Sequence, residues 1–188
     1  TGDWTYTVPN ADVQYLGAGE TKVETFTVKT ADGTEHDVVI TITGTNDGAE
    51  VSGDDRGAVR EDDNNPTLSD SGTLLVSDVD GTDEAVFQTS GIVASAGALG
   101  SLSITETGDW TYTVPNADVQ YLGAGETKVE TFTVKTADGT EHDVVITITG
   151  TNDGAEVSGD DRGAVREDDN NPTLSDSGTL LVSDVDGT

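Results

Sequence analysis

The 188-residue sequence contains no cysteine and no methionine. Disulfide bonds are therefore excluded, so the stability of a folded chain must come from an apolar core or from a bound metal. Histidine occurs at two positions only, which together with the lack of cysteine argues against a zinc or copper site. No apolar run approaches the roughly 20 residues of a membrane-spanning helix, and no signal peptide is visible. An internal excerpt of a longer protein would show neither.

Basic residues are scarce as well, with 8 against 37 acidic residues and a net charge of −29. Such a surface repels nucleic acid and anionic membranes, so neither is expected as a partner. The apolar fraction of 32% is low for a globular protein and, with the charge, leans toward marginal stability or disorder. The strand patterns described below favour a folded chain, provided that something neutralises the acids.

The sequence contains a long internal repeat. Residues 1–82 are identical to residues 107–188, so the period is 106 residues and only residues 83–106 occur once. This period is too long for a solenoid unit and indicates a string of separate domains, each with its own core. The identity indicates a tandem array from which this chain is an excerpt, and neighbouring repeats are its expected partners.

Apolar residues alternate with polar ones over several segments, which predicts strands, and no segment has the spacing of a helix. These strands are expected over 109–114, 128–136 and 142–150. Further strands are expected over 72–78, 84–93 and 99–106. The Asp-Gly pair within 136–140 predicts a hairpin. In the longer connection 114–126, the side chains of Tyr121 and Leu122 are expected to fold back onto the core. The residues that alternation places in the core are Trp110, Tyr112, Val114, Phe132, Val134, Val144, Ile146 and Ile148.

About seven strands per repeat predict an all-β fold, an immunoglobulin-like or cadherin-like β-sandwich. The boundary between domains is expected at the sequence Gly-Thr-Asn-Asp. Residues 48–153 then form one complete sandwich, residues 1–47 the C-terminal part of a preceding repeat, and residues 154–188 the N-terminal part of a following one. Each partial repeat lacks the strands that would cover its apolar face, so Trp4 and Tyr6 are expected to lack their usual partners.

Acidic residues cluster around the predicted boundary. In a sandwich, the loop that carries Asp78 and Asp80 lies at the end where the chain enters, so the acids are expected to gather at that pole. Their copies are expected to gather at the next junction. The candidate ligands are Asn46, Asp47, Glu61, Asp62, Asp78, Asp80 and Asp83, with the copies Asn152, Asp153, Glu167, Asp168, Asp184 and Asp186.

Convergent carboxylates repel one another unless a cation lies among them. Calcium suits such a site because it takes six to eight oxygen ligands in flexible geometry, whereas magnesium demands a strict octahedron. The alternative is a solvated acidic face. The EF-hand loop is excluded because, counting from Asp78, Gly81 is fourth and Thr89 twelfth. Whether Asp12, Glu20 and Asp32, with their copies Asp118, Glu126 and Asp138, add ligands stays open.

The segments GDWTYTV, LGAGETKVETFTVKTADG, VVITITGTND, GAVRED and SGTLLVSDVDG together resemble the VCBS-type repeat, a cadherin-like or immunoglobulin-like module of giant bacterial surface proteins. Near-identical acidic copies resemble the extender region of RTX adhesins of marine bacteria. This resemblance implies type I secretion, a place outside the cell, and stiffening by calcium. Asn46-Asp47, Glu61 and the pair Asp78 and Asp80 match elements with which cadherins bind calcium between domains. Gly48 departs from the family pattern.

The leading hypothesis is therefore a calcium-stiffened spacer that holds a distal ligand-binding region of a surface adhesin away from the cell. The alternative is a directly adhesive module that binds glycan or associates with itself. It would need an exposed aromatic platform, whereas Trp110 and Tyr112 alternate as core residues do. An enzyme is not expected, because His142 lies between two acids at the start of a strand and no nucleophile stands in a catalytic context.

Overall fold

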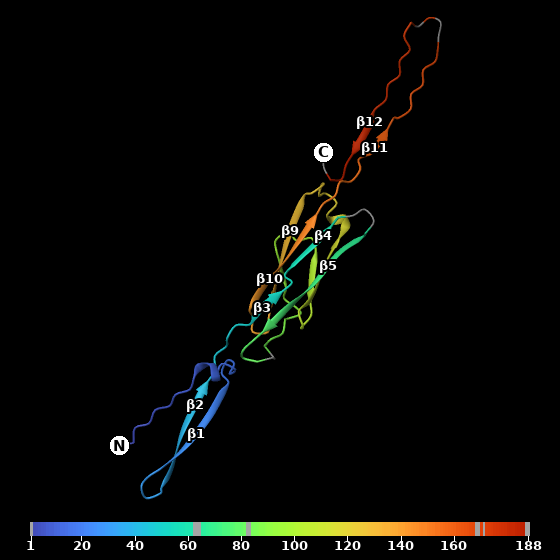
Figure 1. Cartoon of the computed structure of the whole chain (residues 1–188). Coiled ribbons are helices and arrows are strands. Elements are labelled where there is room, and N and C mark those ends of the chain that lie inside the picture. The colour runs from blue at the N-terminus through green and yellow to red at the C-terminus, as the bar shows by residue number, and fades with distance from the viewer. Residues whose placement is uncertain (1, 62–64, 82–83, 168–169, 171, 187–188) are drawn as a thin grey trace.

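The computed structural model of the chain describes residues 2–61, 65–81, 84–167, 170 and 172–186. Within these residues the strands form two four-stranded sheets and two separate two-stranded hairpins, with no α-helix. The N-terminal hairpin, the sheets and the C-terminal hairpin follow one another along the molecule (Figure 1). The predicted all-β class is confirmed.

The two four-stranded sheets form a β-sandwich. The first sheet has the order β4 (Arg56–Arg60), β10 (Glu141–Thr149), β9 (Thr127–Lys135), β6 (Val93–Ala94). The second has the order β3 (Glu50–Gly53), β5 (Thr67–Ser77), β8 (Asp109–Pro115), β7 (Ser101–Ile104). Neighbouring strands are antiparallel except β4 and β10, which are parallel. The rings of Tyr112 in β8 and Phe132 in β9 have centroids 5.7 Å apart, so the sheets pack face to face.

The core consists of the side chains that alternation predicts. Trp110, Tyr112 and Val114 on β8 are 1%, 0% and 0% exposed. The Trp110 indole N–H donates to the carbonyl of Asp54 at 2.7 Å, which satisfies the one polar group of the ring. Phe132 and Val134 on β9, with Val144, Ile146 and Ile148 on β10, complete the predicted set and are all buried.

One carboxylate also lies in the core. Glu130 on β9 shares the inward face of Phe132 and is fully buried. Its carboxylate accepts hydrogen bonds from the backbone N–H groups of Leu99 and Gly100 at 2.7 and 3.1 Å and from the Tyr112 hydroxyl at 2.9 Å. Burial and this last hydrogen bond raise the pKa of Tyr112 above its usual range. Three donors make a buried carboxylate tolerable.

The connections agree only in part with the sequence prediction. The Asp-Gly hairpin joins β9 and β10, with Gly139 at φ 92°. Leu122 packs into the core at 5% exposure, but Tyr121 stays 49% exposed. The strand predicted over 84–93 is wrong, because this segment consists of turns and bends that end in the short β6. Phe87 anchors it through a single bridge to Thr136 and is buried, so the aromatic residue fixes a loop rather than a strand.

A separate pair of antiparallel strands lies toward each end of the chain. β1 (Thr21–Lys29) pairs with β2 (Glu35–Thr43), and β11 (Glu156–Gly159) pairs with β12 (Leu180–Ser183). Residues 3–9 form no strand, although the identical residues 109–115 form β8. The difference follows from pairing, because β8 lies between β5 and β7. The expectation for the aromatic side chains is half right: Trp4 is 61% exposed, whereas Tyr6 still packs on Phe26.

Candidate metal site at the repeat junctions

At the first junction the linker binds the acidic loop that follows β5. The backbone N–H of Asp47 donates to Asp80 Oδ2 at 2.7 Å, and the N–H of Asp80 donates to Asp78 Oδ1 at 2.9 Å. The Asn46 side-chain amide donates to the carbonyl of Asp47 at 2.6 Å. The structure therefore brings together four of the predicted ligands at the pole where the chain enters the sandwich.

The second junction has the same arrangement. The N–H of Asp153 donates to Asp186 Oδ2 at 3.1 Å, and that of Asp186 donates to Asp184 Oδ1 at 3.4 Å. The Asn152 amide donates to the carbonyl of Asp153 at 2.5 Å. A hydrogen bond between the two carboxyl groups raises the pKa of Asp184 and lowers that of Asp186. The two carboxyl groups therefore influence each other, as expected for acids that share one loop.

Two carboxylate oxygens at the first junction are buried without a hydrogen-bond donor among the described residues, Asp78 Oδ2 and Asp80 Oδ1. In each of these side chains the other oxygen accepts a backbone N–H. A desolvated carboxylate oxygen without a hydrogen-bond partner is costly, so such an atom is suited to bind a cation. Two carboxylates on a backbone loop fit calcium, which completes its shell with carbonyl, amide and water oxygens.

The acids do not form a closed cage. The described part of the chain contains no group of three or more histidine, cysteine, aspartate or glutamate side chains placed to hold one ion. A cation would therefore depend on further oxygens that surround the hollow beside the acidic loop. Gln14, Asp47 and Asp78 line this hollow at the first junction. Their copies Gln120, Asp153 and Asp184 line the second. The sequence prediction missed Gln14 and Gln120, although both lie in the repeated connection that precedes strands β1 and β9.

Glu61 lies elsewhere than predicted. Its N–H donates to the carbonyl of Thr149 at 3.0 Å, at the end of β10 opposite the Asp-Gly hairpin. Its carboxylate accepts the N–H of Thr151 at 3.0 Å, the Thr151 hydroxyl and the Gln120 amide. The prediction that Glu61 gathers with Asn46 and Asp47 is therefore wrong. The parallel pairing of β4 with β10 carries Glu61 along the sandwich to the following junction.

The remaining predicted ligands are placed as follows. Glu167, the copy of Glu61, is exposed. Asp62, Asp83 and Asp168 lie outside the described residues. A repeat thus contributes its Glu61-type carboxylate to the junction after it and its Asp78 and Asp80 pair to the junction before it.

Asp138, one of the residues left open by the sequence, fastens the linker. Its Oδ2 accepts the N–H of Ala49 at 3.1 Å and the Thr140 hydroxyl at 2.7 Å. Burial acts to raise the pKa of Asp138, but hydrogen bonds from Thr136, Thr140 and Ala49 outweigh it and hold the pKa well below its usual range. The copy Asp32 accepts hydrogen bonds only within its own turn. The Asp-Gly hairpin is therefore also a clamp on the chain that enters the sandwich.

Glu20 and Glu126 support the loop that faces the acidic residues. The N–H of Gly17 donates to Glu20 at 3.2 Å, and that of Gly123 donates to Glu126 at 3.1 Å. A side chain on Gly17 would lie 3.6 Å from Asp80 Cβ, so this loop contacts the next repeat. Asp12 and Asp118 belong to short 3-10 turns, Asn10–Asp12 and Asn116–Asp118.

Gly150, the glycine of the second Gly-Thr-Asn-Asp sequence, packs against the loop that contains Leu122, where a side chain would not fit. A Cβ on Gly150 would lie 2.1 Å from the carbonyl oxygen of Leu122, whereas a Cβ on Gly154 would meet nothing within 4 Å. We expect Gly150→Ala to lower the free energy of unfolding by about 1–3 kcal/mol, because backbone must move. Gly154→Ala is the matched control and should stay within about 0.5 kcal/mol. Urea unfolding followed by circular dichroism measures both. Equal midpoints would contradict the steric role of Gly150.

Residues 46–150, more than half of the chain, match the model of a protein family described as bacterial cadherin-like domain. The matched segment begins in the first linker and ends at Gly150 in the second. None of the curated proteins compared with the chain matches it significantly. In the described residues, no helix has the length and apolar character needed to traverse a bilayer.

Proposed function

Because the chain belongs to the bacterial cadherin-like domain family, we propose that its repeats form a calcium-stiffened spacer of a giant bacterial adhesin. In this proposal the protein is exported by type I secretion, as RTX adhesins are. Regions outside this chain anchor it to the outer membrane of a Gram-negative cell and carry the distal ligand-binding part. The adhesin would serve attachment to surfaces and growth in biofilms. The proposal assigns no catalytic role to the repeats.

The observation that carries the proposal is the pair of buried oxygens without donors, Asp78 Oδ2 and Asp80 Oδ1. They lie beside the linker, to which Asp80 is already bound through the N–H of Asp47. A bound calcium ion would supply positive charge to these oxygens and offset the repulsion among the acids. The Asp78–Asp80 loop and the linker would then be fixed to each other, which sets the angle between successive repeats.

The repetition of this geometry supports a spacer rather than an isolated site. Asp153 and Asp186 repeat the contact of Asp47 and Asp80 one period later. Strand β5 has 11 residues, so each sandwich adds roughly 36 Å at about 3.3 Å per residue. Extracellular calcium modules bind with dissociation constants of about 10⁻⁴–10⁻³ M, so such junctions fill outside the cell and stay empty inside it.

The alternative of direct glycan binding has less support. Trp110 and Tyr112, whose exposure would have favoured a glycan-binding platform, are buried in the core. His142, which was considered for catalysis, has its Nε2 atom 3.6 Å from Asp55. We therefore propose recognition of neighbouring repeats as the main interaction of this region.

Small-angle scattering of an array of four repeats tests the proposal. With calcium we expect a maximum dimension that grows by roughly one sandwich length per repeat, and with excess chelator a shorter, more flexible particle. Asp78→Ala with Asp80→Ala in every repeat should remove this difference. Magnesium and sodium at equal ionic strength separate specific binding from screening. Identical profiles with calcium and chelator would leave the acids as solvated surface.

A further inference from the structure

A buried carboxylate fixes the chain where it leaves the sandwich. Glu61 is fully buried and accepts hydrogen bonds from the N–H of Thr151 at 3.0 Å, from the Thr151 hydroxyl and from the Gln120 amide. These bonds use both carboxylate oxygens of Glu61. Hydrogen bonds to an ionised carboxylate are stronger than neutral ones, so the contact with Thr151 needs no cation to hold it.

The residue before Thr151 is held as well. The N–H of Gly150 donates to the carbonyl of Glu126 at 2.9 Å, and the carbonyl of Gly150 accepts the N–H of Gly125 at 3.1 Å. A Cβ on Gly150 would lie 2.1 Å from the carbonyl oxygen of Leu122, so the backbone is closely packed here. The leaving chain is therefore fixed to its own sandwich up to Thr151.

A second carboxylate fixes the chain where it enters the same sandwich. Asp138 accepts the N–H of Ala49 at 3.1 Å, and Ala49 is 7% exposed. The hydroxyl and the N–H of Thr140 also donate to Asp138, at 2.7 and 3.0 Å. Although burial acts to raise the pKa of Asp138, these hydrogen bonds hold the pKa well below its usual range. The carboxylate is therefore charged at neutral pH and binds Ala49 without a metal.

Both contacts require the assembled sandwich. Asp138 and Ala49 are 89 positions apart in the sequence, and Glu61 and Thr151 are 90 positions apart. The copy of Asp138 accepts hydrogen bonds only within its own turn, and the copy of Glu61 is exposed. Identical local sequence is thus not enough to make either contact.

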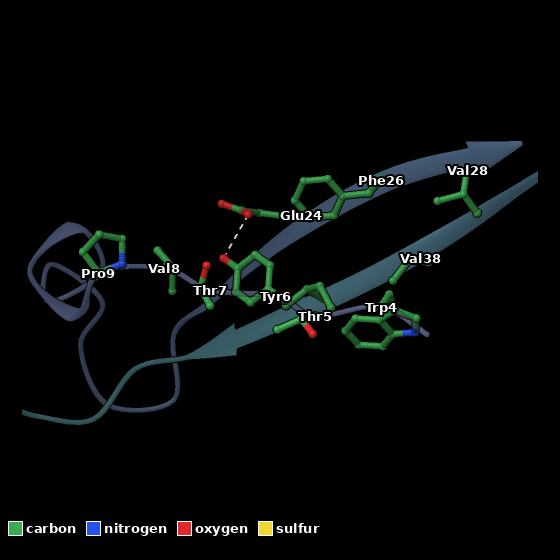
Figure 2. Close-up of a pocket in the computed structure, with 11 residues that line it drawn as sticks. Trp4, Thr5, Tyr6, Thr7, Val8, Pro9, Glu24, Phe26, Val28 and Val38 are labelled. Atoms are coloured by element: carbon green, nitrogen blue, oxygen red, sulfur yellow. Dashed lines mark hydrogen bonds between the residues drawn. The ribbon is translucent and has the colours of Figure 1, made fainter. Parts of the chain in front are cut away.

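Other carboxylate contacts are made in both copies. The Tyr6 hydroxyl donates to Glu24 at 3.0 Å, as that of Tyr112 does to Glu130 at 2.9 Å. Figure 2 shows this bond between the Tyr6 ring and Glu24 on the N-terminal hairpin. Comparison of the copies therefore separates contacts within one segment of the repeat from the two linker contacts, which join its two ends.

Three residues, Asn-Asp-Gly, lie between the two kinds of fixed position. They occur at 46–48 and at 152–154, each time between a threonine of the Thr151 type and an alanine of the Ala49 type. The N–H of Asp47 reaches out of this segment to Asp80 Oδ2, in the acidic pair proposed to bind calcium. A Cβ on Gly154 would meet nothing within 4 Å, so the backbone is not packed there.

We propose that Glu61 and Asp138 are positioning residues that fix the linker from both sides without metal, so that calcium-free repeats bend only at Asn-Asp-Gly. The inference deepens the proposed spacer function and rests on it for the role of calcium. Calcium then has to immobilise three residues instead of a whole linker, which lowers the entropic cost of stiffening. A calcium-free array is a series of rigid sandwiches joined by short hinges.

Hydrogen exchange of single backbone N–H groups in the 188-residue chain, followed by NMR, tests the proposal. In excess chelator we expect the N–H groups of Thr151 and Ala49 to exchange about 100-fold or more slowly than unprotected N–H groups. Those of Asp47 and Asp153 should exchange within about 10-fold of the unprotected rate in chelator and become slow with calcium.

Variants of the two carboxylates show whether each contact acts locally. Glu61→Ala should raise the exchange rate of the Thr151 N–H by about 10-fold or more and leave that of Ala49 unchanged. Asp138→Ala should do the reverse. Glu61→Gln keeps the side-chain volume if the alanine variant fails to fold. It retains one acceptor oxygen in place of two, so it should still accelerate exchange at Thr151 and not at Ala49.

The repeat supplies matched controls. Glu167→Ala and Asp32→Ala remove the same side chains from the copies, where Glu167 is exposed and Asp32 accepts hydrogen bonds only within its turn. Neither variant should change the exchange rate of Thr151 or Ala49. A change of similar size in these controls would contradict the positioning role.

Three further outcomes would overturn the proposal. Slow exchange of Asp47 and Asp153 in chelator would mean that the three residues are fixed without calcium. Fast exchange of Thr151 or Ala49 in chelator would extend the bend beyond three residues. Equal acceleration of both N–H groups in Glu61→Ala would mean that exchange occurs through opening of the whole sandwich.

Failure of the calcium-stiffened spacer gives a different result. If Asp47 and Asp153 exchange fast with calcium as well, while Thr151 and Ala49 stay slow, the two positioning residues are upheld and stiffening by calcium is not.

Discussion

We expect Trp110→Ala to lower the free energy of unfolding of the sandwich by about 3–5 kcal/mol. Trp4→Ala should change it by no more than about 0.5 kcal/mol, although both tryptophans stand in the same local sequence. Trp110 is 1% exposed and Trp4 is 61% exposed, so only the first truncation opens a cavity. Trp110→Ala also leaves the carbonyl of Asp54 without its donor at 2.7 Å.

Urea unfolding followed by circular dichroism, at concentrations where the chain is a single copy, measures the two variants. Trp110→Phe is a further control, because it keeps much of the ring and loses the N–H. Its effect should lie between those of the original chain and Trp110→Ala. Equal effects of Trp4→Ala and Trp110→Ala would mean that residues 2–47 unfold together with the sandwich, and that the hairpin and sandwich are not separate units.

The inward faces of single strands were predictable because they depend on local alternation. Trp110, Tyr112 and Val114 follow this rule, as do Val144, Ile146 and Ile148. Local patterns did not reveal the parallel pairing of β4 with β10, which joins segments about a repeat length apart. Glu61 was misplaced for this reason, since its strand carries it away from the acids nearest in sequence. The segment 84–93, which contains Phe87, was wrongly predicted as a strand. A loop that an aromatic side chain fixes to the core has the same residue composition as a buried strand.

The candidate site was predictable where short loops decide it. Asp78 and Asp80 lie two residues apart after β5, and their loop returns to the linker as sandwich topology requires. The contributions of Gln14 and Asp138 were not predictable, because they reach the first junction only after the connection before β1 and the β9–β10 hairpin have packed. Glu130 was not predicted in the core, although it shares the inward face of Phe132. That a carboxylate is tolerated there depends on donors from residues 99 and 100, which no pattern shows.

Calcium removal should have the second large effect, a fall in the melting temperature of the sandwich. At a calcium concentration 100-fold above the dissociation constant, one site contributes about 2.7 kcal/mol. For a domain of this size, 1 kcal/mol corresponds to about 4–8 °C, so excess chelator should lower the melting temperature by about 10–20 °C. The reason is that Asp78 Oδ2 and Asp80 Oδ1 are buried without donors and require a cation. Differential scanning calorimetry with calcium and with chelator measures the shift.

Paired variants separate binding from charge screening in this calcium experiment. Asp78→Asn with Asp80→Asn should remove the share of the calcium response that comes from the first junction and leave only that of Asp184 and Asp186 at the second. In chelator this variant should melt no lower than the original chain, because two repelling charges are gone. Asp160→Asn with Asp161→Asn removes the same charge from exposed positions and should keep the full response. If sodium at equal ionic strength restores the melting temperature as calcium does, the stabilisation comes from screening of the net charge of −29 rather than from a bound ion. An undiminished response to calcium in the Asp78 and Asp80 variant would move the site to the second junction, with Asp184, Asp186 and Glu61 as the next residues to change.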